Sequence, residues 1–148
     1  MTFVYVIFII DFVFGNDPKI FYSPNRRISI SYFLECFTKK YVCFEGRARR
    51  AEYWFFTLFN GLIAFLLVFG TAMASGNPAI AQMVGNIWML IALLPGVSVF
   101  IRRLHDTNRT GANFFWIFLP VIGAIILLVF MVTDGTRGPN KYGESPKA

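Results

Sequence analysis

Two long runs without a charged residue constrain this chain more than any other feature. Asp, Glu, Lys and Arg are absent from 53–101, which is 49 residues, and from 110–133, which is a further 24. The chain is also 56% hydrophobic and only 15% charged, whereas an ordinary soluble domain is about 45–50% apolar and about 25% charged. These values exclude a soluble globule, a disordered chain and an ordinary nucleic-acid-binding protein. They predict an integral membrane protein.

The charge-free runs divide into three predicted transmembrane helices. About 20 apolar residues cross a hydrocarbon core of about 30 Å as a helix. The first run breaks at the turn residues Ser75–Pro78, which gives spans over 53–74 and 79–101. The second run gives one span over 112–132. Hydrophobicity is continuous and does not alternate with period two, which excludes membrane-spanning strands. We therefore expect an all-α membrane protein.

Basic residues predict the orientation, because Lys and Arg near the ends of spans are retained on the cytoplasmic side. Five of them precede the first span and three lie between the second and third spans, whereas the turn at Ser75–Pro78 carries no charge. This distribution predicts a cytoplasmic N-terminal flank and an outside turn. With three spans, the short polar tail at 133–148 is then expected outside. The basic residues concerned are Lys39, Lys40, Arg47, Arg49 and Arg50, followed by Arg102, Arg103 and Arg109.

Two segments precede the spans within the predicted architecture. Residues 28–42 place apolar side chains at helical spacing and polar ones opposite, which predicts an amphipathic helix in the membrane interface. A helix packed on the cytoplasmic ends of the spans is the alternative, and the two are not exclusive. Residues 1–27 are interpreted as an N-terminal extension, apolar at 1–14, which is either the product of an upstream start codon or a fourth span. Residues 28–148 then form a single membrane domain.

The first polar motif, which we call the arginine segment, covers residues 44–54. Gly46 permits a turn, the arginines reach lipid phosphates, and the aromatic pair lies at headgroup level. We therefore expect a membrane-anchoring motif facing anionic lipid headgroups; a specific anionic-lipid site is the alternative. Its predicted residues are Gly46, Arg47, Arg49, Arg50, Glu52, Tyr53 and Trp54.

The second polar motif, the histidine segment, covers residues 102–111 and is expected to form a cytoplasmic loop. His105 beside Asp106 suggests proton transfer, since a carboxylate orients an imidazole. Adjacent helical residues do not face each other, however, so a structural role is favoured. One His with two distant Cys provides no metal site, and neither a cofactor nor a catalytic residue is expected. The residues of this motif are Arg102, Arg103, His105, Asp106, Arg109 and Gly111.

These two motifs, together with a Gly-Pro-Asn-Lys-Tyr-Gly stretch in the tail, resemble the domain-of-unknown-function 805 family of YhaH-like small bacterial inner-membrane proteins. The resemblance covers roughly residues 31–146, and residues 1–27 lie ahead of where such proteins usually begin. It implies a multi-pass protein of the bacterial plasma membrane. It brings no established reaction.

Packing between the spans is predicted from small and polar residues. Counted from the cytoplasmic ends, Asn60, Pro95 and Pro120 fall in one layer. Pro95 lacks an N–H and frees the carbonyl of Ile91. We expect Asn60 to bond the backbone loosened by Pro95 or Pro120; a contact with a partner subunit is the alternative.

Three classes of function are compatible with this architecture. A non-enzymatic accessory or interaction component requires only packing residues, such as Gly70 with Ala74 and Ala81 with Gly85. A subunit of an oligomeric transporter or channel normally carries ionisable residues within the bilayer, and the predicted spans contain none. A membrane enzyme would depend on His105 and Asp106. We favour the first class, with the bilayer and either a second copy or another membrane protein as partner, and no nucleic acid.

Overall fold

The computed structural model describes residues 29–146, and all regular elements within that part of the chain are helices. The prediction of an all-α protein is confirmed. The predictions for residues 1–28, including the fourth span, lie outside the described residues. The helices are α3 (Ser29–Thr38), α4 (Arg50–Ser75), α5 (Pro78–Asp106), the 3₁₀ helix η1 (Gly111–Phe118) and α6 (Ile122–Val132).

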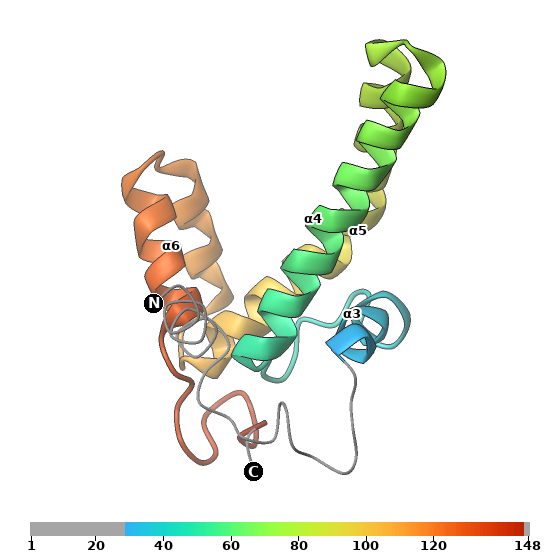
Figure 1. Cartoon of the computed structure of the whole chain (residues 1–148). Helices are drawn as coiled ribbons and strands as arrows, with labels where there is room; N and C mark the ends of the chain where they lie inside the picture. The colour runs from blue at the N-terminus through green and yellow to red at the C-terminus, as the bar shows by residue number, and fades with distance from the viewer. Residues whose placement is uncertain (1–28, 147–148) are drawn as a thin grey trace, which may run out of the picture.

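Helices α4 and α5 form a long antiparallel hairpin (Figure 1). Their 26 and 29 residues correspond to about 39 and 43 Å, against about 40–45 Å for a bilayer with its headgroups. Both are long and apolar enough to cross a membrane. Gly76 closes the turn with a φ of 61°, and Asn77 caps α5 by accepting from the Ala79 N–H at 2.9 Å. The predicted break at Ser75–Pro78 is confirmed.

Small residues let these two helices approach closely. A Cβ on Gly85 would lie 2.8 Å from a Val68 methyl, and Ala81, one helical turn earlier, is buried. Gly70, in contrast, has nothing within 4 Å of its Cβ position. The Ala81–Gly85 pair therefore lies at the α4–α5 contact, as expected, whereas Gly70 lies on an open surface.

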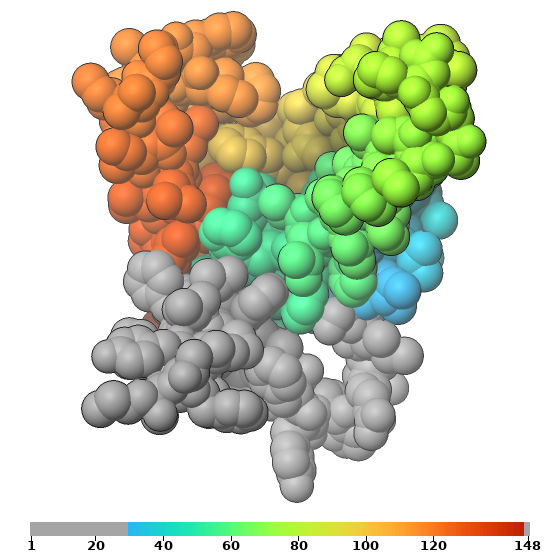
Figure 2. All heavy atoms as spheres, turned by 45° about the horizontal axis from the view of Figure 1, so that its top comes forward, coloured from blue at the N-terminus to red at the C-terminus, as the bar shows by residue number. Residues whose placement is uncertain are grey.

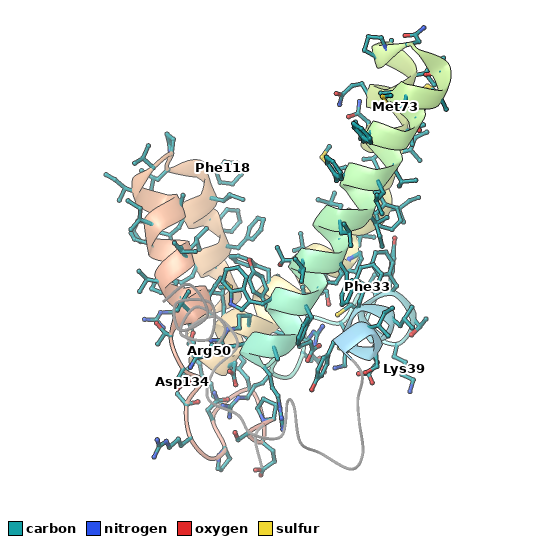
Figure 3. All side chains as sticks on the ribbon, in the orientation of Figure 1. Phe33, Lys39, Arg50, Met73, Phe118 and Asp134 are labelled. Atoms are coloured by element: carbon teal, nitrogen blue, oxygen red, sulfur yellow. The ribbon has the colours of Figure 1, made fainter. Side chains whose placement is uncertain are left out.

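Helix α3 packs against α4 and α5, near the end of the hairpin where α4 begins. Phe33 is 8% exposed and Cys36 is fully buried. The Phe33 and Phe37 rings contact the Phe56 ring, with centroids 5.7 and 5.8 Å apart. Figure 3 shows Phe33 between α3 and the long hairpin. Ile30 and Leu34 remain about half exposed. The structure therefore shows α3 packed on the long hairpin, which is the second of the two predicted arrangements. The exposed side chains of Ile30 and Leu34 are compatible with a position in the membrane interface, which stays a prediction.

Asn60 faces α5, but its partner differs from the predicted one. Its Oδ1 accepts from Trp88 Nε1 at 3.1 Å. The Ile91 carbonyl freed by Pro95 instead accepts from the Tyr41 hydroxyl at 2.8 Å. The hypothesis that Asn60 bonds this carbonyl is wrong, because a phenol arriving from the segment before α4 reaches it.

This contact predicts a coupling between Tyr41 and Pro95. We expect Tyr41→Phe to lower the free energy of unfolding by about 0.6 kcal/mol, the average for intramembrane hydrogen bonds. In the Pro95→Ala background the cost should fall, because the new N–H satisfies the Ile91 carbonyl. Unfolding of both single variants and the double variant in detergent measures the coupling. Tyr32→Phe is the control, and strictly additive costs would contradict the assignment.

The segment predicted as the third span is not one helix. Helix η1 runs outward for eight residues and α6 returns for eleven, each about 16 Å long. The two form a hairpin beside α4 and α5, with Phe118 near its tip (Figures 1 and 3). The prediction of a continuous span over 112–132 is therefore wrong.

Proline and glycine explain why the chain reverses here. Pro120 lacks the N–H that would continue the helix, and its carbonyl accepts from the Ile122 N–H at 2.8 Å in a γ-turn centred on Val121, which has a φ of 66°. A Cβ on Gly123 would lie 1.8 Å from the Trp116 carbonyl oxygen. Only glycine allows the returning backbone to pass so near.

The returning hairpin carries the tail back to the end of the molecule where α4 begins. Thr136 N–H donates to the Asp106 carbonyl at 2.9 Å, and Arg50 pairs with Asp134 at 2.6 Å. Figure 3 shows Arg50 and Asp134 at this same end, with Met73 at the opposite end of the long hairpin. The tail therefore contacts the first residue of α4 and the last residue of α5, whereas the sequence predicted it on the other side of the membrane from the N-terminal flank; the side on which it lies stays a prediction.

Candidate functional site

The candidate site is a buried ionic cluster centred on the Asp106 carboxylate, at the last residue of α5. Arg47 approaches one oxygen at 3.0 Å and Arg103 pairs with the other. All three side chains are no more than 3% exposed. Buried charges persist only when they are paired and hydrogen-bonded, and each Asp106 oxygen here accepts from a guanidinium.

Local backbone structure explains how Arg47 reaches this position. Gly46 takes a φ of 80°, which favours glycine. The next residue but one, Ala48, donates its N–H to the Arg102 carbonyl at 3.0 Å. Upstream, Ser98 in α5 accepts from the Cys43 N–H at 3.2 Å. The segment before α4 is therefore fastened along α5, and Arg47 points inward rather than toward the membrane surface.

The tail provides the remaining hydrogen-bond acceptors for Arg47. Its guanidinium donates to the carbonyls of Thr136 at 2.6 Å, Gly138 at 2.8 Å and Gly143 at 3.3 Å. Asn140 Nδ2 donates to the His105 carbonyl at 3.0 Å. The tail motif noticed in the sequence thus folds as a turn whose carbonyl groups bind a buried arginine. We call this arrangement the tail clasp: Arg47, Asp106 and residues 134–143.

His105 packs against the clasp. Its ring stacks on Tyr142 with centroids 3.8 Å apart and planes 5° from parallel. Its Nδ1 lies 3.3 Å from the Gly46 carbonyl oxygen. The neighbouring Asp106 carboxylate points to Arg47 and Arg103 instead. The structure thus places His105 and Asp106 in one cluster without pairing them. The prediction of a loop is wrong for residues 102–106, which form the last turn of α5, because their charges are paired and allow the helix to continue.

A second buried cluster joins α3 to the long hairpin. Arg102 donates to Glu52 at 2.5 Å and Lys40 donates to the same carboxylate oxygen at 3.1 Å. Cys36 lies 3.8 Å from Arg102. Burial, with a further contribution from the Glu52 carboxylate, raises the pKa of the Cys36 thiol to about 11. The thiol is therefore protonated at neutral pH, which makes it a packing residue rather than a nucleophile.

The lipid-headgroup prediction does not hold for Arg47 and Arg50. Arg47 is buried in the clasp, and Arg50 donates to the Val132 carbonyl at 2.8 Å besides pairing with Asp134. Tyr53 packs on Phe100 with centroids 6.1 Å apart. Arg49 remains half-buried, and its contact with lipid stays a prediction. The arginine segment thus turns largely toward the protein.

Arg109 and Gly111 of the histidine segment lie in neither of the two buried clusters. Arg109 stacks over the Phe130 ring at 3.8 Å. Gly111 starts η1, where a Cβ would meet an Ile101 methyl at 3.2 Å. Both therefore help to attach the η1–α6 hairpin to α5. Among residues 29–146, no group of three or more His, Cys, Asp or Glu side chains is placed to hold a metal ion.

Sequence reasoning singled out most residues of the two clusters but not their pairing. It missed Thr136, and it noted Asn140 only as part of the tail motif, without its contact with the His105 carbonyl. Arg47 and Asp106 are 59 residues apart, so no local pattern links them. The one indication of this pairing in the sequence was that each motif contains an acidic residue beside several arginines.

These features define a small helical protein with two helices long and apolar enough to cross a membrane, closed at one end by buried ion pairs. Residues 41–144 match the family model described as "Protein of unknown function (DUF805)". The chain belongs to this family, as its motifs predicted.

Three proteins of Escherichia coli strain K12 are similar to this chain, and two of them are inner membrane proteins. The inner membrane protein YhaI is 44% identical over 110 residues, covering 74% of this chain and 90% of the relative. The inner membrane protein YhaH is 39% identical over 114 residues, covering 74% and 91%. The uncharacterised protein YiiR is 28% identical over 131 residues, covering 68% and 84%. No solved structure matches the chain significantly.

Proposed function

We propose that this protein is a non-enzymatic component of the inner membrane that acts by binding other membrane-embedded helices through α4 and α5. The observation that carries this proposal is that the polar residues are paired with one another, whereas the apolar surfaces of the long helices are exposed. The polar motif residues bind one another and the tail, whereas the most apolar stretches of α4 and α5 are only 6% and 22% buried. The charged side chains of the two motifs therefore stabilise the fold, and the long apolar faces of α4 and α5 are available to contact other membrane helices.

We further propose that α4 and α5 cross the bilayer while the η1–α6 hairpin enters and leaves on the cytoplasmic side. Three observations support this arrangement: the clasp between the tail and Arg47, the half-span length of each hairpin helix, and the basic residues. The tail adds Arg137, Lys141 and Lys147 to the side already richest in Lys and Arg, in keeping with the positive-inside rule.

Photocrosslinking in native membranes tests the binding role. A photoreactive residue at Leu62 or Leu66, which are 49% and 56% exposed on α4, should give a discrete adduct whose partner peptides are identified by mass spectrometry. A position inside the clasp, such as Thr136, is the control and should give internal links alone. A defined second membrane protein supports the accessory role. Assembly solely with copies of itself, together with ion flux in proteoliposomes, would favour a channel subunit instead.

A substitution at His105 tests the enzyme alternative. In the proposed role, His105→Asn weakens the stack on Tyr142, so any loss of complementation in a deletion strain should accompany a loss of protein abundance. Gel filtration and immunoblotting measure assembly and amount. A variant that is abundant and correctly assembled but inactive would contradict the non-enzymatic role.

A further inference from the structure

The described helices are distributed unevenly along the long hairpin. The part of α4 and α5 nearest the turn at Gly76 extends beyond α3, η1 and α6 (Figure 1). Figure 2 shows the two hairpins as separate arms that diverge from a common base. Within residues 29–146, five helices therefore contribute to the end where α4 begins, which we call the wide end, whereas α4 and α5 alone form the end at the turn.

Aromatic contacts place α3 at the wide end. The Phe33 ring lies 5.7 Å from that of Phe56 and 6.0 Å from that of Phe59, measured between centroids. Both partners belong to the first ten of the 26 residues of α4. The Phe37 ring lies 5.8 Å from that of Trp88 in α5. Helix α3 therefore widens the molecule beside the beginning of α4 and leaves the turn uncovered.

The η1–α6 hairpin is attached at the same end. The Phe114 ring in η1 contacts that of Phe100 with centroids 5.6 Å apart, and a Cβ on Gly111 would meet an Ile101 methyl at 3.2 Å. Phe100 and Ile101 belong to the last seven residues of α5. From this attachment η1 and α6 extend about 16 Å, which is about half of a hydrocarbon core of about 30 Å.

The far end of this hairpin is suited to acyl chains. Residues 114–132 contain no charged or amide side chain, and Phe118 and Val121 at the reversal are largely exposed. Exposed apolar surface of this kind is unfavourable in water. In the proposed arrangement, the hairpin therefore inserts into the cytoplasmic leaflet and ends near the centre of the bilayer.

Helix dimensions give the resulting difference between the two leaflets. A helix about 10 Å across covers about 80 Å² of the membrane plane, so η1 and α6 together displace about 160 Å² of lipid from the cytoplasmic leaflet. Of the described helices, only α4 and α5 pass through the outer leaflet. A leaflet that is expanded relative to its partner favours curvature in which it is the convex one. Insertion from one side makes membrane binding sensitive to curvature for this reason.

We propose that this protein binds preferentially to strongly curved membrane in which the cytoplasmic leaflet is convex, as in folds of the inner membrane toward the cytoplasm. Its partner in this role is a curved lipid surface, recognised through the unequal width of the protein in the two leaflets. This inference rests on the proposed arrangement, in which the η1–α6 hairpin enters and leaves on the cytoplasmic side.

The test measures orientation in vesicles of two sizes. The full chain carries one epitope tag inserted after Gly76 and a different tag after Ala148, and it is reconstituted in small sonicated and large extruded vesicles of one lipid composition. External protease removes the tags that face outward. The outer leaflet of a small vesicle is strongly convex, so molecules with the tail outward should exceed those with the tail inward by about threefold, equivalent to about 0.7 kcal/mol. In large vesicles the two orientations should be closer to equal.

The two tags separate failure of this inference from failure of the proposed arrangement. If the tail and the turn lie on opposite sides of the membrane, each molecule loses one tag and keeps the other. Loss of both tags or of neither would overturn the proposed arrangement, and this inference with it. Loss of one tag per molecule, with the same ratio of orientations in small and large vesicles, would overturn the curvature preference alone.

A charge at the reversal tests whether the hairpin causes the preference. Phe118→Asp should withdraw this end of the hairpin from the hydrocarbon, where a carboxylate is costly, and should lower the ratio in small vesicles to that in large ones. Met73→Asp is the matched control, because Met73 is 72% exposed against 74% for Phe118 but lies three residues before the turn at Gly76. Val121→Asp replaces Phe118→Asp if that variant does not elute as a monodisperse species. A ratio that persists in the hairpin variant, or falls equally in the control, would contradict the proposal.

Discussion

Replacing Asp106 with asparagine is expected to lower the free energy of unfolding by about 3–5 kcal/mol, the usual cost of breaking a buried ion pair by removing one partner. The physical reason is that Asp106 neutralises two guanidinium groups, those of Arg47 and Arg103, whose side chains are 1% and 0% exposed. Without the carboxylate, both cations remain buried without a counter-charge. The tail should detach as well, because Arg47 holds three of its carbonyl groups.

Asp134→Asn provides the matched control for this experiment. Asp134 also pairs with an arginine, Arg50, but its side chain is 62% exposed. Exposed ion pairs contribute about 0–1 kcal/mol, so the control should cost correspondingly little. Denaturant titration in detergent, followed by tryptophan fluorescence, measures both values. Equal costs for the two variants would show that the clasp is not the electrostatic centre of the fold.

The second large effect is expected at the η1–α6 hairpin. Gly123→Ala should destabilise the protein by about 3 kcal/mol, at the upper end of the cost of overpacking. The added methyl would lie 1.8 Å from the Trp116 carbonyl oxygen, and this neighbour is backbone that cannot rotate away. We therefore expect the two arms of the hairpin to separate, which thermal unfolding and limited proteolysis of the detergent-solubilised protein will detect.

The control at Gly70 should change stability in the opposite direction. Gly70 lies inside α4 with nothing within 4 Å of its Cβ position, so alanine gains about 0.5–1 kcal/mol of helix propensity there. If Gly70→Ala and Gly123→Ala have the same effect, the close approach of η1 and α6 is contradicted.

The sequence predicts the two long helices well because their evidence is local. Continuous hydropathy gives their length, and Gly76, Asn77 and Pro78 occur consecutively where a turn must form. The third apolar segment, residues 112–132, was predicted incorrectly because hydropathy depends on composition and does not show where the chain reverses its direction. Two helices of half the length, running out and back, present the same apolar composition as one helix that crosses the membrane.

The two internal prolines show why the distinction is not local. Pro95 lies within a continuous helix, and the carbonyl that it frees is satisfied by Tyr41, which is 50 residues away from Ile91. Pro120 lies at a chain reversal, which Gly123 permits by leaving space for the backbone of Trp116. In each case the outcome depends on a group outside the immediate helical turn.

The candidate site has the same limitation. The sequence identifies Arg47, Arg103 and Asp106 as unusual residues, but it predicts lipid contact for the arginine segment because basic residues beside a span commonly bind headgroups. The burial of Arg47 requires the tail to return to it, and that return depends on the hairpin. An incorrect third span therefore leads to an incorrect environment for the arginine.

The central claim is that the η1–α6 hairpin returns the tail to the cytoplasmic side. The most direct measurement is the activity of alkaline phosphatase, which is active outside the cytoplasm, fused after Ala148 of the full chain. An insertion of the same enzyme after Gly76, in the α4–α5 turn, serves as the positive control. We expect high activity from the insertion at Gly76 and background activity from the fusion at Ala148. High activity at both Ala148 and Gly76 would place the tail on the same side as the α4–α5 turn and contradict the clasp.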